Sequence, residues 1–440
     1  MKLERTIGLT GAIAMVVGSV IGMGAFVLIP IICSKTGTAA WLSITIALVM
    51  SVLSVFPLIQ LSSALPKAGV GFEYGKTFLS PLYGTVFSWW SIWGGAAGLA
   101  LVAFGLVKSF KAWLPDGFSL HLAALILVAL FYLVYQFGVK VLTALQVGMT
   151  FVMFLALVLY ITAAFITYGG TSTFTLPSDS SFLMAIIVSF NISLGFQIIM
   201  EMGEEIKRPE KNIPLALAIG ALVVLSLYLL TAIAYTGAVG IENLIHTPDL
   251  IMTVAPVLPD WAIMFIRVGV VCAGLTCFNG AAIAIPREIY AQSRAEVMPE
   301  AFSRIHKNGN PQNAITLFFV LVFALFLTGD VLDRTGVLTY FFGESVIEFY
   351  GYMTIMGIML LTMGICFCAW RLPRTMPEAY QKAYIHFSPA VLHLLIVGAT
   401  LTSLFLLALV STKWLIPLLY IFITGTVILL YKIFVPTKRN

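Results

Sequence analysis

Long apolar runs separated by short polar stretches extend along the whole chain. A helix needs about 20 consecutive apolar residues to cross the hydrocarbon layer of a bilayer. On this criterion the sequence predicts about twelve transmembrane helices, and an even number places both chain ends on one side of the membrane. The predicted ranges are 9–33, 38–64, 82–110, 120–138, 141–168, 181–205, 213–236, 261–288, 312–329, 339–370, 387–410 and 414–434.

The composition supports an all-α integral membrane protein. Hydrophobic residues make up 60% of the 440 residues, charged residues 10%, and the mean hydropathy is +1.03. Soluble domains contain about 45–50% apolar and about 25% charged residues. The outer surface of this fold must therefore be apolar too, and we expect a lipid bilayer around it. The net charge of +5 gives no reason to expect a nucleic acid partner.

The distribution of Lys and Arg predicts the orientation. With both termini inside, only six of the 24 basic residues fall on the outer side. These six are Lys35, Lys108, Lys111, Arg267, Arg334 and Lys413. Basic residues accumulate on the cytoplasmic side of membrane proteins. The pattern therefore predicts cytoplasmic termini in a multi-pass protein of the cell (plasma) membrane.

The connections between spans are short, so we expect one membrane domain over residues 1–440. The longest inner connections, 65–80, 289–311 and 371–386, predict short amphipathic or turn segments. The chain has no Walker A sequence, which argues against ATP-driven chemistry within it. Its five cysteines lie in apolar runs and its five histidines lack metal-ligand spacing. We therefore predict no disulfide framework, no metal site and no cofactor.

Two predicted spans contain helix-breaking sequences. Residues 18–26 read Gly-Ser-Val-Ile-Gly-Met-Gly-Ala-Phe, and residues 190–197 read Phe-Asn-Ile-Ser-Leu-Gly-Phe-Gln. Small residues at this spacing also serve helix packing in membranes, so packing is the alternative explanation for the first stretch. Interrupted helices five spans apart, however, are typical of secondary transporters built from inverted repeats. Freed N–H groups attract a carboxylate and freed carbonyls an ammonium group.

Several motifs resemble the amino acid–polyamine–organocation (APC) superfamily, amino acid permease type. Gly22-Met23-Gly24-Ala25-Phe26 is similar to its Gly-x-Gly-x-Phe signature. The run from Gly203 to Pro214, Gly-Glu-Glu-Ile-Lys-Arg-Pro-Glu-Lys-Asn-Ile-Pro, is more specific and resembles the end of helix 6 and the start of helix 7. Further similar segments are 64–69, 137–140 and 286–311, so the resemblance covers residues 8–370.

The resemblance implies a LeuT-type fold with broken helices 1 and 6. Helices 1–5 (residues 1–168) and 6–10 (181–370) would be inverted repeats, followed by helices 11 and 12 (387–434). It also implies a small-molecule substrate, an amino acid or amine, between the two breaks. The substrate-binding residues expected from the family pattern and the neighbouring polar side chains are Ile21, Gly22, Met23, Gly24, Ala25, Asn191, Ile192, Ser193, Gln197 and Trp93.

The chain departs from the family pattern at three positions. Some members carry a lysine in helix 5 that takes the place of a sodium ion, and the corresponding position here is Met153. Gln197 stands where many relatives have an acid, and Asn191 aligns with an aromatic gate residue of arginine–agmatine exchangers. These changes predict a modestly polar pocket, or interhelical hydrogen bonds, and no lysine-based coupling.

Charged residues within spans are candidates for coupling or gating because each costs at least about 2.5–3.5 kcal/mol on insertion scales. Glu204 and Glu205 match the family motif and lie near Lys207, Arg208 and Lys211, so we interpret them as inner ion pairs. Glu201, one turn deeper, is a candidate proton site. Arg267, Glu344 and Glu348 form the outer set, as a structural salt bridge, a proton site or a vestibule for cationic amines.

The leading hypothesis is a secondary transporter of small or polar neutral amino acids. It would be sodium-independent, working by exchange or with protons, because helix 5 and helix 8 offer few oxygen ligands. A polyamine or cationic amine transporter is the alternative. An intramembrane enzyme would need a nucleophile–base pair or a metal cluster, and a channel would need a pore-loop signature; the sequence contains neither.

Overall fold

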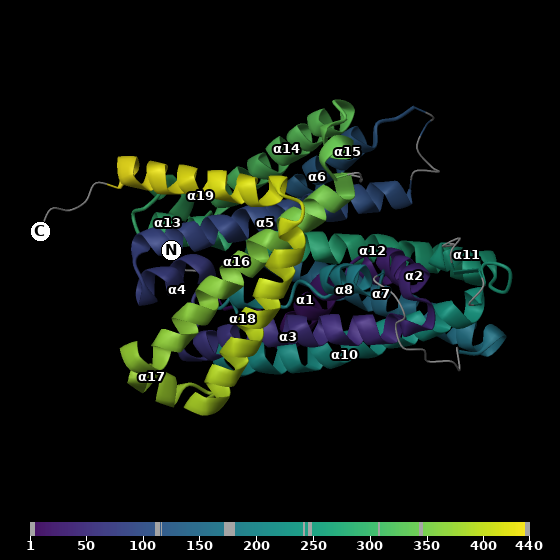
Figure 1. Cartoon of the computed structure of the whole chain (residues 1–440), viewed down its shortest axis with the longest axis horizontal. Coiled ribbons are helices and arrows are strands. Elements are labelled where there is room, and N and C mark those ends of the chain that lie inside the picture. Colours follow the sequence, from purple (N-terminus) through teal and green to yellow (C-terminus); the bar gives the residue numbers. More distant parts are fainter. Residues whose placement is uncertain are drawn as a thin grey trace, which may run out of the picture.

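The computed structural model describes residues 5–110, 115, 117–170, 181–240, 243–244, 249–306, 309–342 and 346–435. These residues are mainly helical (Figure 1). Their β pairing is limited to two isolated bridges, Ile7 with Ile206 and Ala68 with Met202. Both bridges involve the segment that follows residue 201, which therefore contacts two distant parts of the chain.

The first half of the chain begins with a helix broken into α1 and α2, followed by long helices with short connections. The elements are α1 (Leu9–Ile21), α2 (Gly24–Thr36), η1 (Gly37–Ala39), α3 (Ala40–Ala64), α4 (Val70–Phe78), α5 (Pro81–Ser109), α6 (Leu120–Val134), η3 (Tyr135–Phe137) and α7 (Val139–Tyr168).

The second half also begins with a broken helix. The elements are α8 (Ser181–Ile192), α9 (Ile198–Glu201), α10 (Pro209–Val239), α11 (Leu250–Val254), α12 (Asp260–Ala284), α13 (Pro286–Arg294), η5 (Glu300–Ser303), α14 (Gln312–Arg334), α15 (Val337–Phe342), α16 (Val346–Thr375), α17 (Pro377–Lys382), α18 (Pro389–Ser411) and α19 (Leu415–Phe434).

Each of the twelve predicted ranges overlaps a helix of the structure. By length and apolar composition, the described residues contain nine candidate membrane spans. One of them, Leu9–Ala64, is 56 residues long and includes α1, α2 and α3. Leu120–Val134 and Phe182–Ile192 are shorter apolar helices. The chain is thus an all-helical multi-pass membrane protein, and twelve crossings remain a prediction.

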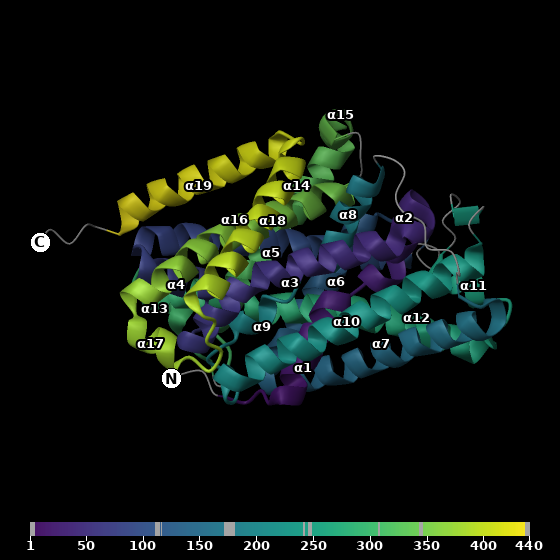
Figure 2. The ribbon, with the colours of Figure 1, turned by 60° about the horizontal axis from the view of Figure 1, so that its bottom comes forward.

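The inner connections fold as the polar and glycine-rich pattern predicts. Residues 65–80 contain α4, residues 289–311 contain η5, and residues 371–386 contain α17. The helices α4, α13 and α17 lie at one end of the elongated molecule, on the left of Figures 1 and 2. We call this the basal end. Lys111, one of the basic residues expected outside, lies beyond the described residues, as do Lys2, Lys307, Lys438 and Arg439.

Lipid exposure of the helix bundle is visible in the distribution of its large apolar side chains. Ile166 is 81% exposed, Leu222 67% and Phe422 72%, on α7, α10 and α19. Exposed apolar side chains of this size are unfavourable in water, but they are compatible with the hydrocarbon layer of a bilayer. The interior instead buries polar groups such as Gln146, Asn279 and Arg287, and burial of this kind requires internal partners.

Candidate functional site

The first break lies where the sequence predicts it, between α1 and α2. Helix α1 ends at Ile21, and Gly22 adopts φ +41° and ψ −145°, a conformation in which other L-residues are strained. Gly24 then starts α2. The first N–H groups of a helix have no acceptor within it. The N–H groups of Gly24 and Ala25 are therefore open to a ligand.

The second break separates α8, which ends at Ile192, from α9, which begins at Ile198. Gly195 has φ +121°, and a Cβ there would lie 2.9 Å from the carbonyl oxygen of Ser19. A Cβ on Gly24 would lie 2.6 Å from Cγ2 of Ile192. Each break therefore fits against the other only because a glycine leaves room for a backbone or side chain.

Tyr228 of α10 joins the two breaks through its hydroxyl group. The Oη atom lies 2.8 Å from the carbonyl oxygen of Val20, 3.3 Å from that of Ile21 and 2.6 Å from that of Ile192. These are carbonyls freed by the breaks, and two of them belong to Ile21 and Ile192, which the sequence predicted to bind the substrate. Sequence reasoning missed Tyr228. Its position in the middle of an apolar span could have indicated its role, because a buried tyrosine hydroxyl usually has a hydrogen-bond partner.

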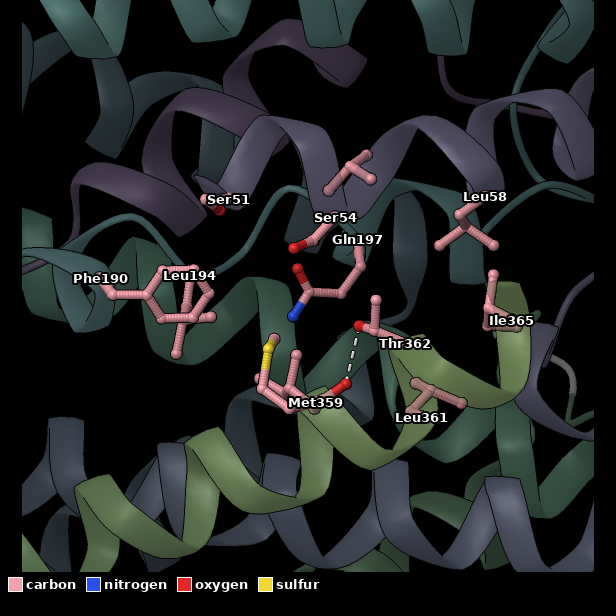
Figure 3. Close-up of a pocket in the computed structure, with 12 residues that line it drawn as sticks. Ser51, Ser54, Leu58, Phe190, Leu194, Gln197, Met359, Leu361, Thr362 and Ile365 are labelled. Carbon is pink, nitrogen blue, oxygen red and sulfur yellow. Dashed lines mark hydrogen bonds between the residues drawn. The ribbon is translucent and has the colours of Figure 1, made fainter. Parts of the chain in front are cut away.

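A small cavity lies beside the second break, between α3 and α16 (Figure 3). Its volume of about 20 Å³ is enough for one water molecule. Gln197 extends into the space between Ser54 and Thr362, with Leu194 and Met359 near it. The cavity is too small for an amino acid, so the structure represents a closed conformation of this region.

The other polar residues of the second break form interhelical or local hydrogen bonds. Ser193 donates from Oγ to the carbonyl of Ser189 at 2.9 Å, and its own carbonyl accepts from Oγ of Ser51 at 2.6 Å. Asn191 lies near Gly351 of α16, and its Oδ1 is buried without a hydrogen-bond partner among the described residues. An orphaned buried acceptor is rare, which makes Asn191 a candidate ligand for a substrate N–H. Trp93 of α5 is half-buried.

Neutral side chains fill the interface of α1 with α7 and α12. Thr150 Oγ1 and Gln146 Nε2 donate to the carbonyl of Ala14 at 3.1 and 3.3 Å. Thr276 Oγ1 lies 3.1 Å from the carbonyl of Gly18 and 2.8 Å from that of Ala273. The sequence aligned Met153 of α7 with the helix 5 lysine of some family members. Met153 is fully buried, but Gln146 and Thr150 are the residues of α7 that contact the α1 carbonyls.

Four charged side chains form a cluster at the basal end, which we call the basal ion-pair cluster. Arg287 of α13 binds Glu205 through two contacts, Nε to Oε1 at 2.8 Å and Nη2 to Oε2 at 3.2 Å, and both side chains are buried. Arg294 binds Glu204 at 2.8 and 3.0 Å. The predicted ion pairs therefore form, but the expected partners at 207–211 were wrong. Folding brings in α13 instead.

A second group of charges lies at the N-terminus of α4. Glu201 Oε2 accepts from the N–H of Val70 at 3.0 Å. Glu288 of α13 accepts from Gly71 at 2.7 Å and from Phe72 at 3.0 Å. The sequence indicated Glu201 as a candidate site but not Glu288. The charge of Glu288 at the end of a predicted span could have marked it as a second candidate.

The structure describes two of the three outer charged residues, Arg267 and Glu348. Arg267 is half-buried on α12, and Glu348 is exposed in the first turn of α16. Glu344 lies outside the described residues. The expected salt bridge from Arg267 to one of these glutamates therefore stays a prediction.

Comparison with known families decides the identity. The family model described as amino acid permease matches residues 7–439, nearly the whole chain. The protein is an amino acid permease of the APC superfamily. The resemblance inferred from the glycine signature and the 203–214 run is thereby confirmed. The permease is accordingly a membrane transporter and not an enzyme.

Individual relatives of the permease are distant in sequence. An uncharacterized transporter of Mycobacterium tuberculosis is 24% identical over 375 residues, 83% of this chain and 81% of the relative. The cystine/glutamate transporter of Homo sapiens is 23% identical over 392 residues, 85% and 75% of the two chains. A vacuolar cationic amino acid transporter of Arabidopsis thaliana is 26% identical over 336 residues, 70% of this permease but only 52% of the relative. The family therefore establishes amino acid transport in general.

Proposed function

We propose that this permease carries small or polar neutral amino acids by alternating access, independently of sodium. The observation that supports this most directly is the contact between the two helix breaks. Gly24 and Ala25 offer N–H groups at the start of α2, and Ile21 and Ile192 have carbonyls freed by the breaks. A zwitterion carries a carboxylate and an ammonium a few ångströms apart, and it matches this pair of half-helix ends.

The side chains around the breaks favour a neutral substrate. Residues 18–30 and 189–200 contain no Lys or Arg. A dianionic amino acid would need a basic partner for its second carboxylate, because an unpaired buried charge is very costly. Asn191, with its orphaned Oδ1, and Gln197 provide neutral polar contacts instead. Tyr228 would stabilise the freed carbonyls while no substrate is bound.

The fold that accompanies this mechanism is a LeuT-type pair of inverted repeats, residues 1–168 and 181–370, with 387–434 added outside them. Breaks near the start of each repeat support this assignment. We place the basal end in the cytoplasm because most of the basic residues lie on that side of the predicted topology. The cell membrane is the proposed location.

Proteoliposomes containing the purified full-length chain test the substrate class. We expect unlabelled alanine, serine and other small neutral amino acids to compete strongly with labelled serine for uptake. Arginine, a diamine and glutamate should compete weakly at the same concentration. Empty liposomes provide the background. High-affinity uptake of glutamate or aspartate would contradict the proposal directly.

A carrier of cationic amino acids or amines is the second candidate. It is favoured by the exposed carboxylate of Glu348 at the start of α16 and by the similarity to the Arabidopsis relative, which is a cationic amino acid transporter. In the same competition assay, stronger inhibition by arginine or the diamine than by alanine would select this candidate.

A further inference from the structure

Two carboxylates that are distant in the sequence are in contact at the basal end. Glu201 ends α9 and is 2% exposed, and Glu288 lies in the first turn of α13 and is 0% exposed. Their carboxyl groups accept hydrogen bonds from consecutive backbone N–H groups, Glu201 from Val70 and Glu288 from Gly71 and Phe72, so the two groups lie next to each other. Two carboxylates can form a hydrogen bond only if one of them carries a proton. We call these two residues the carboxylate pair.

Backbone donors around the carboxylate pair suit one negative charge. The N–H groups of Val70, Gly71 and Phe72, at the start of α4, point at the pair over 2.7–3.0 Å. The N-terminus of a helix is equivalent to roughly half a positive charge. One ionised carboxylate matches this environment, whereas two adjacent ionised carboxylates would repel each other strongly in a buried site.

The nearby charged groups are already engaged with other partners. Arg287 binds Glu205 through both carboxylate oxygens, and Arg294 binds Glu204. On α4 itself Lys76 pairs with Glu73 at 3.0 Å, and Lys67, just before α4, is exposed. Arg287 is close enough to act on the charge of Glu201, but among the described residues no salt bridge joins a basic side chain to Glu201 or Glu288.

The neutral titratable groups next to the pair keep their protons. Burial raises the pKa of Tyr74 of α4, its hydrogen bond with Ser62 opposes the rise, and the charge of Glu201 adds to it. Its hydroxyl donates to the carbonyl of Leu65 at 2.9 Å. From α16, Cys368 faces the same region. None of these groups supplies a positive charge.

One buried acceptor atom near Glu288 has no hydrogen-bond donor among the described residues. Gln292 donates from Nε2 to Oγ of Ser88 of α5 at 2.7 Å and to the backbone carbonyl of Glu288 at 3.3 Å. The Oε1 atom of Gln292 is fully buried and has no partner among the described residues. Buried acceptors without a donor are rare, so this atom marks a place for a water or other donor next to the pair.

We propose that Glu201 and Glu288 share a single proton, which closes the basal end of the permease. While the proton is present, the pair joins α9 to α13 and holds the N-terminus of α4 against both. When the proton leaves to the solution at the basal end, the two negative charges repel and α9 separates from α13. Protonation therefore stabilises the closed basal end, and a rise in pH on that side favours its opening.

Infrared spectroscopy of the purified, full-length protein tests the proton without any substrate. We expect the C=O stretching band of a protonated carboxylic acid at neutral pH, shifted on exchange into deuterium oxide. The band should disappear in Glu201→Gln and in Glu288→Gln. It should persist in Glu378→Gln, which removes an exposed carboxylate of α17 at the same end. Absence of the band in the wild type, or its persistence in both pair variants, would overturn the proposal.

Transport assays test the consequence of the proton, which rests on the proposed function. Exchange of labelled serine should accelerate as the pH on the basal side rises at constant pH on the opposite side. Because one proton is involved, the rate should change by no more than about tenfold per pH unit. Glu201→Gln retains an acceptor for Val70 and a donor for Glu288, so its rate should be independent of this pH, whereas Glu378→Gln should behave as wild type.

The two experiments can refute the proposed substrate class and the shared proton independently of each other. If no amino acid is exchanged but the infrared band is present and lost in the pair variants, the proposed substrate class fails and the shared proton stands. If serine is exchanged with the same pH response in the wild type and in Glu201→Gln, the amino acid assignment stands and the proposed role of the proton fails.

Discussion

At the scale of single residues, glycine determines how closely the broken helices approach. Gly24 faces Ile192 so closely that a Cβ would lie 2.6 Å from Cγ2 and 2.8 Å from Cβ of that side chain. Gly195 contacts the backbone at Ser19 in the same way. A substrate that binds backbone groups needs this proximity, because any side chain at these positions would separate the two breaks.

Substitution of Gly24 tests this interpretation. Gly24→Val should abolish uptake in proteoliposomes, because its side chain overlaps Ile192 and blocks the N–H groups of α2. Overpacking costs about 1–3 kcal/mol, so we expect the protein to be expressed and to elute as a folded species in size-exclusion chromatography. Gly148→Ala, on the surface of α7 with open space around it, is the control. Uptake by Gly24→Val at the wild-type rate would refute the site.

At the scale of elements, the segment after α9 connects three parts of the fold at the basal end. Its backbone pairs with the N-terminal segment, with Ile7 N–H donating to the carbonyl of Glu205 at 3.1 Å. Glu201, the last residue of α9, reaches α4, and Glu204 and Glu205 of the segment reach α13 through the basal ion-pair cluster. These contacts hold the N-terminal segment, α4 and α13 together at the basal end.

The buried ion pair in this segment should affect stability strongly when one partner is removed. Arg287→Met leaves Glu205 charged, buried and unpaired, which costs about 3–5 kcal/mol. We expect a clearly lower thermal transition in detergent. The double variant Arg287→Met with Glu205→Leu should recover much of the loss, because it removes both charges.

The control for this experiment is Arg304→Met, since Arg304 is 70% exposed and lies 3.7 Å from Glu300. Surface pairs of this kind contribute about 0–1 kcal/mol, so the transition should hardly move. Equal effects of Arg287→Met and Arg304→Met would show that burial of the first pair has no energetic importance.

At the scale of the whole molecule, coupling depends on how α1, α7 and α12 pack together. The carbonyls of Ala14 and Gly18 accept hydrogen bonds from Gln146, Thr150 and Thr276. In secondary transporters with broken helices, backbone carbonyls and other oxygens coordinate the coupling sodium ion. The α1 carbonyls of Ala14 and Gly18 accept from neutral donors instead, which agrees with the proposed transport without sodium.

Ion gradients across proteoliposomes test this prediction. Replacing sodium by potassium, or imposing an inward sodium gradient, should leave serine uptake unchanged. An absolute requirement for internal substrate would identify exchange. Stimulation by an inward proton gradient that is lost in Glu201→Gln would identify proton coupling. Strong stimulation by sodium would contradict the structural argument.

Local properties of the sequence were enough to predict the membrane class, the helical ranges and both interruptions. Hydropathy over about 20 residues decides whether a segment can lie in lipid. Breaks at Gly22 and around Gly195 follow from the conformational freedom of glycine, and the structure places them there. The same local signal predicted a short amphipathic or turn segment at 65–80, where the structure has α4.

Contacts between distant segments were decided only by the tertiary structure. Glu205 was expected to pair with basic residues close to it in sequence, but its partner is Arg287, 82 residues away. Tyr228 and Glu288 gained their roles in the same way, from the packing of α10 against both breaks and of α13 against α9 and α4. Hydropathy determines which helices enter the membrane, whereas the complementary packing of their buried faces determines which polar groups meet inside it.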